Sequence, residues 1–253
     1  ACPGAMAACV DLGLQRQGKP EDNRRLSDAA LALGFGTQAW ETEVHGRLGR
    51  QHMQAMGLPA ATAEPAAGAA KRPRLQASAP RRARELSRLT LHVETPDQLQ
   101  GIDESNQVLA SYDIVAIVPH SEEALSRALD GPARTAVDVV RLPMDQRLPF
   151  LLSAQLGRKA ARAGIAFEIP YGLALRDAAT RRHLLAAAQQ VCAARGPRGV
   201  IITSGAAGEA ALRAPGDLAH LATLFGLTVR EGWDAMQGNA EAVLLRARRR
   251  KQR

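Results

Sequence analysis

The sequence predicts an α/β protein with a TIM-like (β/α) barrel of about seven strands. Residues 164–204 contain the clearest β-α-β unit: an apolar run ending at Glu168 and Pro170, a helical pattern, and a second β-branched run ending at Ser204. Both runs are apolar at nearly every position, which is typical of parallel strands covered by helices on both faces. Along the chain, seven strand-like segments alternate with helical ones. An open doubly wound sheet is the alternative architecture.

The N-terminal elements are short. An apolar strand over residues 9–14 is followed by a helix that Asp22 or Asn23 can cap and that Gly34 ends. A second strand is expected over residues 35–40, although glycines and a glutamine interrupt it. These segments predict the first two strands of the barrel.

The later elements carry clear start and stop signals. A proline ends the apolar strand over residues 112–118, and another follows the strand over 137–142. Further strands are expected over 86–93, 164–171 and 199–204, with helices over 99–109, 121–129, 156–163, 177–195 and 215–225. Thr228 begins a capping-box pattern, and Asn239 can cap the last helix.

Composition divides the chain further. Residues 60–70 hold seven alanines. The segment around them has too few large apolar side chains for their burial to offset the conformational entropy that ordering the segment would cost. The predicted organisation is an N-terminal extension over 1–7, the first part of the barrel over 8–49, a disordered insertion over 50–84, the rest of the barrel over 85–245, and a basic tail over 246–253.

The positive charge is concentrated in two segments. The chain carries +8 overall, but residues 71–88 and 246–253 together carry +12, so the remainder sums to −4. Such basic runs are typical of nuclear localisation signals, of arms that bind phosphate through counterion release, or of solvated disorder. The barrel itself is expected to be slightly acidic.

The remaining composition narrows the class of protein. Hydrophobic residues at 46% and charged residues at 23% are ordinary globular values. No apolar run approaches the roughly 18 residues of a membrane span, and we expect a soluble chain without membrane contact. Three cysteines without a pairing pattern indicate a reducing compartment. Aromatic residues make up only 3%, so nucleic acid would be contacted through phosphate rather than base stacking.

One cationic cluster lies at an unfavourable place. Arg176, Arg181 and Arg182 surround the first turn of the predicted helix over 177–195, where the helix dipole disfavours cations. They are either solvated or placed to bind an external polyanion. As candidate RNA- or partner-binding residues we name these three together with Arg158, Lys159, Arg248, Arg249 and Arg250.

Catalytic motifs are missing from the sequence. None of the six histidines lies in an H-x-H or H-E-x-x-H pattern, and no nucleophile elbow or P-loop is present. Glu168 lies near the C-terminal end of a strand, where barrel enzymes place catalytic groups, but an arginine can equally hold it in a structural ion pair. Glu168, Asp113 and Ser204 are interpreted as structural strand-end residues. We therefore predict no catalytic residue and no metal site. This predicts a barrel that works by holding a partner, and three or more histidines and acids within coordinating distance of one point at the barrel mouth would overturn that interpretation.

A series of short motifs follows in fixed order over roughly residues 86–246. They are Leu89-Thr90, Tyr112-Asp113-Ile114-Val115-Ala116, Pro119, Val137-Asp138, Leu148-Pro149-Phe150, Gly164-Ile165-Ala166-Phe167-Glu168, Tyr171, Arg176-Asp177, Arg181-Arg182, Val200-Ile201-Ile202-Thr203-Ser204, Gly216-Asp217-Leu218-Ala219, Leu224-Phe225-Gly226-Leu227 and Asn239-Ala240. Ala8-Cys9-Val10-Asp11-Leu12 and Leu33-Gly34-Phe35 fit the same pattern. In these motifs the chain resembles the thirty-kilodalton protein subunit family of eukaryotic and archaeal ribonuclease P, shared in eukaryotes with ribonuclease MRP.

The resemblance implies a barrel similar to the polymerase-and-histidinol-phosphatase type and a subunit that is not itself the catalyst. The RNA component removes the 5′ leader of precursor tRNA with its own magnesium ions, so this chain is expected to bind no cofactor. The implied partners are ribonuclease P RNA, precursor tRNA, a Pop5-like subunit and other ribonuclease P/MRP proteins. The implied location is the nucleus and nucleolus, with a further role in rRNA processing.

The chain departs from its relatives in two places. Metal-dependent phosphatases of this barrel type carry H-x-H on the first strand, whereas this chain has Asp11-Leu12-Gly13. After the second strand, where family members often have Asn-His or Asn-Arg, it has Ala39-Trp40-Glu41-Thr42, so no contact is carried over for that loop. The alternative function is a metal-dependent phosphoesterase, which would require convergence of Glu168, His92, His120, Asp11 and Asp113.

Overall fold

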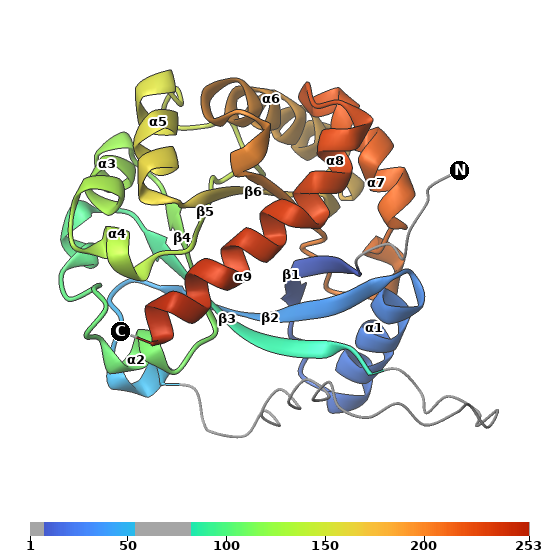
Figure 1. Cartoon of the computed structure of the whole chain (residues 1–253), viewed down its shortest axis with the longest axis horizontal. Coiled ribbons are helices and arrows are strands. Elements are labelled where there is room, and N and C mark those ends of the chain that lie inside the picture. The colour runs from blue at the N-terminus through green and yellow to red at the C-terminus, as the bar shows by residue number, and fades with distance from the viewer. Residues whose placement is uncertain (1–7, 54–81, 253) are drawn as a thin grey trace, which may run out of the picture.

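Parallel strands lie side by side in chain order around a barrel (Figure 1). The computed structural model describes residues 8–53 and 82–252. Within this part the sheet has seven strands, each paired in parallel with the next. The strands are β1 (Cys9–Gln15), β2 (Phe35–His45), β3 (Arg84–Val93), β4 (Ile114–Pro119), β5 (Val139–Arg141), β6 (Ala166–Pro170) and β7 (Val200–Thr203). The predicted TIM-like fold class is confirmed.

Helices cover the outside of the barrel and one of its ends (Figure 1). The α-helices are α1 (Pro20–Ala32), α2 (Gln107–Ala110), α3 (Glu122–Asp130), α4 (Ala133–Ala136), α5 (Ala154–Ala163), α6 (Ala178–Arg195), α7 (Pro215–Leu221), α8 (Val229–Met236) and α9 (Gly238–Lys251). Short 3-10 turns are η1 (Arg50–His52), η2 (Pro96–Leu99), η3 (Tyr171–Leu175), η4 (Pro197–Gly199), η5 (Glu209–Ala211) and η6 (Ala222–Phe225). No helix in the described ranges is long and apolar enough to cross a membrane.

Several helix ends follow local chemistry. The Asp177 carboxylate accepts from the N–H groups of Ala179 and Thr180, both at 2.8 Å, which confirms it as the N-cap of α6. Thr228 and Glu231 form the predicted capping box of α8. The prediction for Asn239 is wrong: α9 begins at Gly238, and the Asn239 amide instead donates to the Pro197 and Val200 carbonyls at 2.7 Å.

The start of α1 also differs from the prediction. The helix begins at Pro20, with Lys19 rather than Asp22 or Asn23 in the cap position. Pro20 suits the first helical position because its fixed φ is helical and it needs no N–H partner there. The Asn23 side chain turns back to the preceding loop, where it accepts from Gln17 N–H at 2.7 Å.

In the described residues, the barrel closes between its first and last strands through individual hydrogen bonds rather than through a continuous strand ladder. Gln15 N–H donates to the Ala206 carbonyl at 2.9 Å, and Ser204 N–H donates to the Asp11 carboxylate at 3.1 Å. Gly13 permits this approach, since a Cβ there would lie 2.9 Å from the Thr203 hydroxyl oxygen. The structure thus favours the barrel over the open sheet.

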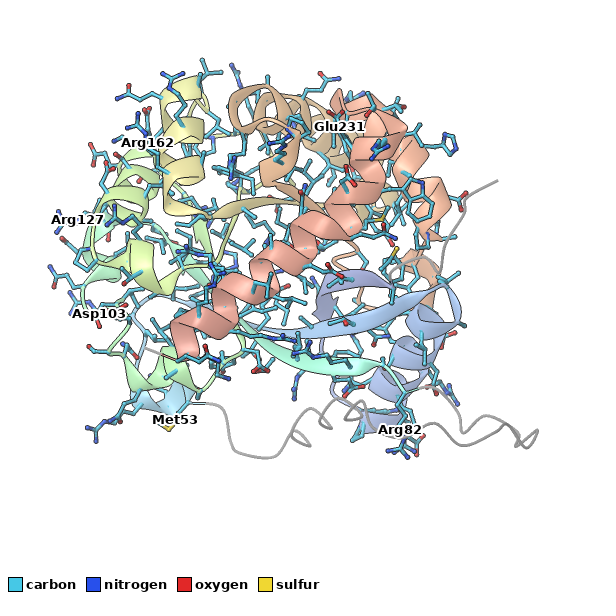
Figure 2. All side chains as sticks on the ribbon, in the orientation of Figure 1. Met53, Arg82, Asp103, Arg127, Arg162 and Glu231 are labelled. Carbon is cyan, nitrogen blue, oxygen red and sulfur yellow. The ribbon has the colours of Figure 1, made fainter. Side chains whose placement is uncertain are left out.

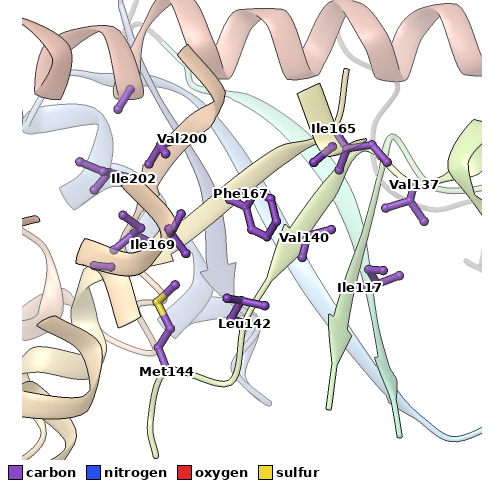
Figure 3. Packing of buried hydrophobic residues seen from close by; sticks show 14 of the residues in the cluster. Ile117, Val137, Val140, Leu142, Met144, Ile165, Phe167, Ile169, Val200 and Ile202 are labelled. Carbon is purple, nitrogen blue, oxygen red and sulfur yellow. The ribbon is translucent and has the colours of Figure 1, made fainter. Parts of the chain in front are cut away.

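Two apolar cores hold the barrel together. The larger core lies between the strands and the outer helices, where Val140, Phe167, Ile169 and Ile202 are almost fully buried (Figure 3). A smaller core fills the barrel interior beneath α9; its members are Val10, Leu12, Ala39, Leu86, Ile114, Ala116, Val139, Ala166, Ile201, Ala240, Val243, Leu244 and Ala247. Helix α9 therefore closes the N-terminal end of the barrel, which leaves the C-terminal end for a site.

The predicted insertion and the predicted basic tail have different boundaries in the structure. Residues 54–81, most of the predicted insertion, lie outside the described residues, as do residues 1–7. At the edges, η1 includes Arg50 and β3 already begins at Arg84. Residues 246–251 are the last turns of α9 rather than a separate tail.

Replacing Gly157 by alanine is expected to destabilise the protein by about 1–3 kcal/mol despite the better helix propensity of alanine. Gly157 is buried on α5, and an added Cβ would overlap the carbonyl oxygen of Ala194 on α6. The control is Gly216→Ala on α7, where a Cβ meets nothing within 4 Å. The urea midpoint of unfolding should fall for Gly157→Ala and stay at the wild-type value for Gly216→Ala. Equal midpoints for the two variants would show that α5 and α6 can move apart without cost.

Candidate functional site

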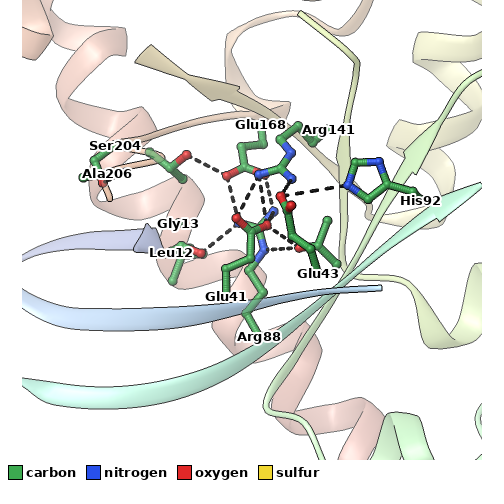
Figure 4. A network of polar contacts seen from close by, with 12 residues as sticks. Leu12, Gly13, Glu41, Glu43, Arg88, His92, Arg141, Glu168, Ser204 and Ala206 are labelled. Carbon is green, nitrogen blue, oxygen red and sulfur yellow. Dashed lines mark hydrogen bonds and ion pairs between the residues drawn. The ribbon is translucent and has the colours of Figure 1, made fainter. Parts of the chain in front are cut away.

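The C-terminal half of the barrel interior is polar and charged. Strands β2, β3, β5, β6 and β7 place buried polar side chains there, and Figure 4 shows their ion pairs and hydrogen bonds. The members are Glu41, Arg88, Thr90, Arg141, Glu168 and Thr203. Charges are costly at this depth unless each is paired and hydrogen-bonded, so their bonding decides what they can do.

Arg88 lies at the centre of this network with no exposed surface. Its guanidinium pairs with both carboxylate oxygens of Glu168 and donates to the Leu12 carbonyl at 2.8 Å. Burial alone would lower its pKa, but the charges of Glu168 and Glu41 outweigh burial and raise it. Burial would raise the pKa of Glu168, and Arg88 reverses this and lowers it. Both groups are therefore charged, and Glu168 is a structural ion-pair partner.

A second arginine extends the network toward the mouth of the barrel. Arg141 contacts Glu41 at 2.9 Å and Glu43 at 2.6 Å. Burial would lower its pKa, but Glu41, Glu168 and Glu43 together raise it. Across Glu41, Glu43 and Glu168 there are three carboxylates for the two guanidiniums. The surplus negative charge lies at Glu43, which is the most exposed of the three, at 39% of its side chain.

Imidazole rings gather beside Glu43. His45 on β2 is the register partner of His92 on β3, and their rings stack at 4.0 Å between centroids. His120 follows β4, and its Nε2 lies 3.2 Å from His92 Nδ1. His92 Nε2 faces Glu43 Oε1 at 3.9 Å, too long for a hydrogen bond (Figure 4). His92 and the Arg141 guanidinium lower the pKa of Glu43 to about 2.

Three of these residues form a group that could hold a metal ion, which the sequence did not predict. Glu43, His45 and His92 each offer one ligand atom, and the three atoms lie within 4.8 Å of one another. Sequence reasoning missed the group because it ended the second strand at Trp40. The strand continues to His45, and Glu43-Val44-His45 places the glutamate and the histidine on one face. That E-x-H spacing was the available signal.

The residues required for the alternative phosphoesterase do not converge in the described structure. Asp113 lies at the N-terminal end of β4, where it accepts from Ser87 and pairs with Lys251 at 2.8 Å. Asp11 is buried, its Oδ1 accepts from Gly13 and Ser204 N–H groups, and burial raises its pKa. Glu168 is held by Arg88. Of the five residues, only His92 and His120 contact each other.

The predicted cationic residues occupy separate surfaces. Arg176, Arg181 and Arg182 are exposed around the start of α6, with Arg181 Nε donating to the Ala174 carbonyl at 2.8 Å. On α5, Arg158 is exposed, while Lys159 pairs with Asp130 of α3. A hollow of about 260 Å³ on α5 is lined by Gln155, Arg158, Lys159 and Arg162, and Arg162 points outward in Figure 2.

The arginines of α9 divide between surface and interior. Arg248 and Arg249 are exposed. Arg250 is only 8% exposed, and its guanidinium bonds to Asp138 at 3.2 Å and to the carbonyls of Leu109, Tyr112 and Asp113. Arg250 therefore joins α9 to the barrel, and of the three predicted α9 arginines Arg248 and Arg249 remain exposed. The start of α6 follows β6 and lies toward the opposite end.

These features define a TIM-like α/β protein. Its seven-stranded parallel barrel is covered at one end by helix α9, and arginine–glutamate ion pairs occupy the other half of its interior. The acid at the strand end, Glu168, is held in one of these ion pairs. The chain belongs to the ribonuclease P subunit p30 family, whose model matches residues 7–252. The predicted family is confirmed.

Relatives carry matching names. The chain is 33% identical over 169 residues to "Ribonuclease P protein subunit p30" of Mus musculus, covering 66% of this chain and 61% of that protein. It is 32% identical over 168 residues to "Protein GAMETOPHYTE DEFECTIVE 1" of Arabidopsis thaliana, covering 66% and 28%. It is 30% identical over 164 residues to "Ribonuclease P/MRP protein subunit RPP1" of Saccharomyces cerevisiae, covering 65% and 54%. The match thus spans less than two thirds of each of these relatives.

Solved structures share the fold. A chain in a structure of archaeal ribonuclease P with mature tRNA superposes with a TM-score of 0.62 at 14% identity, covering 93% of this chain and 90% of that one. Ochratoxinase of A. niger superposes with a TM-score of 0.53 at 10% identity, covering 94% and 71%. The barrel is thus common to a ribonucleoprotein subunit and an enzyme, so function has to be argued from the residues.

Proposed function

We propose that the chain is a non-catalytic protein subunit of a ribonuclease P complex that binds the catalytic RNA and supports removal of the 5′ leader from precursor tRNA. The observation that carries this proposal is membership of the p30 family over residues 7–252. In the proposed complex, the RNA component holds the magnesium ions of the reaction. The partners are a Pop5-like subunit and other ribonuclease P proteins, shared with ribonuclease MRP for rRNA processing, in the nucleus and nucleolus.

The barrel interior is consistent with a subunit that does not cleave RNA. Glu168 lies where barrel enzymes place a catalytic acid, but both of its oxygens pair with Arg88 and Oε1 also accepts from the Thr203 hydroxyl. A carboxylate held this way has its pKa lowered and is not available as a general acid. The predicted lack of metal ligands does not support this interpretation, because Glu43, His45 and His92 could hold an ion. Family membership and the Glu168 pair support it instead.

The start of α6 is the proposed RNA contact. Its 18-residue helix directs a positive dipole end at three exposed arginines, and only the Asp177 cap offsets that charge locally. A phosphate backbone placed there would satisfy the guanidiniums and the helix end together. Contacts through arginine and phosphate read shape rather than sequence, which fits the 3% aromatic content.

Replacing Arg176, Arg181 and Arg182 together by alanine is expected to weaken binding to ribonuclease P RNA. The slope of log K against log salt concentration should become shallower by up to about three, because up to three phosphate contacts are removed. The matched control removes three exposed arginines elsewhere, Arg24, Arg25 and Arg127. Filter-binding titrations between low and physiological salt measure both effects. If the α6 variant and the control have the same slope as the wild type, the RNA contact lies elsewhere.

A protein-interaction module without RNA contact makes a different prediction. In that case, crosslinking of the assembled complex would join this chain to the Pop5-like subunit and give no RNA adducts. RNA adducts at the start of α6 would support the proposed role.

A further inference from the structure

A three-residue group at the barrel mouth has no role in the proposed RNA-binding function. Glu43 and His45 lie at the C-terminal end of β2, and His92 lies directly across on β3. Their ligand atoms fall within 4.8 Å of one another. Glu43 and His45 are exposed and His92 is partly buried, so an ion can reach the group from solvent.

We propose that Glu43, His45 and His92 bind one divalent transition-metal ion of the zinc class. Two imidazoles and one carboxylate are the ligand types that zinc prefers, and three protein ligands leave a fourth position for water. Tetrahedral bonds of about 2.0–2.2 Å to a shared ion place ligand atoms about 3.4 Å apart, so the side chains have to draw together when the ion binds. Glu43 and His45 are exposed, which leaves their side chains room to turn toward His92.

His92 supplies an independent observation. Its Nε2 is buried without a hydrogen-bond partner, and it faces the Glu43 carboxylate at 3.9 Å. Buried polar atoms are normally satisfied, and an ion between His92 and Glu43 would satisfy this one. Stacking with His45 accounts for the position of the ring but gives Nε2 no partner.

The surrounding residues are arranged like the outer shell of a metal site. His92 Nδ1 lies 3.2 Å from His120 Nε2, and with Nδ1 as the donor, His92 Nε2 is left with a free lone pair toward Glu43. Arg141 holds Glu43 Oε1 at 2.6 Å. Arg141 also lowers the attraction for a cation, although the inner network still has one carboxylate more than it has guanidiniums.

The test is calorimetric titration of the full chain, stripped with chelator, with zinc sulfate. We expect one equivalent to bind, and each of His45→Gln, His92→Gln and Glu43→Gln to lower the association constant at least about tenfold. His120→Asn, which changes only the outer shell, should lower it about 10- to 100-fold. Magnesium should not compete at equal concentration, because it prefers oxygen ligands.

The matched control is His220→Gln, an exposed histidine on α7, which should bind zinc like the wild type. Folding of every variant is checked by urea unfolding, and zinc should raise the midpoint in the wild type and in His220→Gln but not in the three ligand variants. The proposal is overturned if the wild type shows no binding, or if a folded His45→Gln/His92→Gln variant binds zinc as tightly as the wild type. RNA affinity does not enter these measurements, so a failure of zinc binding and a failure of the proposed RNA binding are distinguishable.

Discussion

Replacing Arg88 by methionine is expected to lower the free energy of unfolding by about 3–5 kcal/mol, the largest effect of any single change considered. The Arg88 guanidinium pairs with Glu168 and lies 3.5 Å from Glu41, and all three side chains are almost completely buried. Without it, two carboxylates would face each other inside the barrel with only Arg141 to compensate them. Urea unfolding followed by circular dichroism measures the loss.

Two further variants show whether the loss is due to an unpaired charge. Glu168→Gln in the Arg88→Met background removes one of the two carboxylates left without a partner. The double variant should therefore lose less free energy of unfolding than the sum of the losses in the two single variants. Lys159→Ala breaks the more exposed Lys159–Asp130 pair on the surface and should cost at most about 1 kcal/mol. An Arg88→Met variant as stable as Lys159→Ala would show that the buried network does not stabilise the barrel.

Replacing Arg250 by alanine is expected to cost about 3 kcal/mol and to loosen α9 from the barrel. Its guanidinium bonds to the Asp138 carboxylate and to three backbone carbonyls in α2 and in the turn that leads into β4. Asp138 has no exposed surface, and burial already raises its pKa. Removing Arg250 leaves that carboxylate with Arg246 as its remaining ion-pair partner, at 3.7 Å.

The neighbouring Arg249 provides the control, because it lies on the exposed face of the same helix turn. Arg249→Ala should change stability by no more than about 0.5 kcal/mol. Hydrogen exchange should report faster opening of α9 in Arg250→Ala alone. Equal stability and equal exchange in the two variants would refute the role of Arg250 in holding α9.

The strands and several helix ends were readable from local sequence. The single helix expected over 99–109 was not found; η2 (Pro96–Leu99) and α2 (Gln107–Ala110) stand there instead, with residues 100–106 between them. Runs such as residues 114–118 are apolar at every position because a parallel barrel buries both faces, and this pattern needs no partner to be recognised. Asp177 and Thr228 were recognised as caps because a cap bonds to N–H groups two or three residues away. The motifs of the p30 family were read in the same way, along the chain.

The length of β2 and the charged side chains inside the barrel could not be predicted from the sequence. Glu41 and Glu43 both lie on β2, where Glu41 is buried inside the barrel and Glu43 lies at its mouth. Their partner Arg141 is about 100 positions away, and Arg88 reaches Glu168 across 80. A charged residue is tolerated in a barrel only if such a distant partner is present, and no local pattern reveals it.

The amino-acid sequence by itself determined the fold class, the order of strands and helices, and the family, because these depend on periodicity, caps and motifs within short segments. Only the tertiary structure decided that Glu168 is held by an arginine, that Arg250 is buried, and that Glu43, His45 and His92 meet at the barrel mouth. The physical reason is that parallel pairing brings strand ends together from far apart in the chain, and side-chain chemistry there depends on which charges and rings become neighbours.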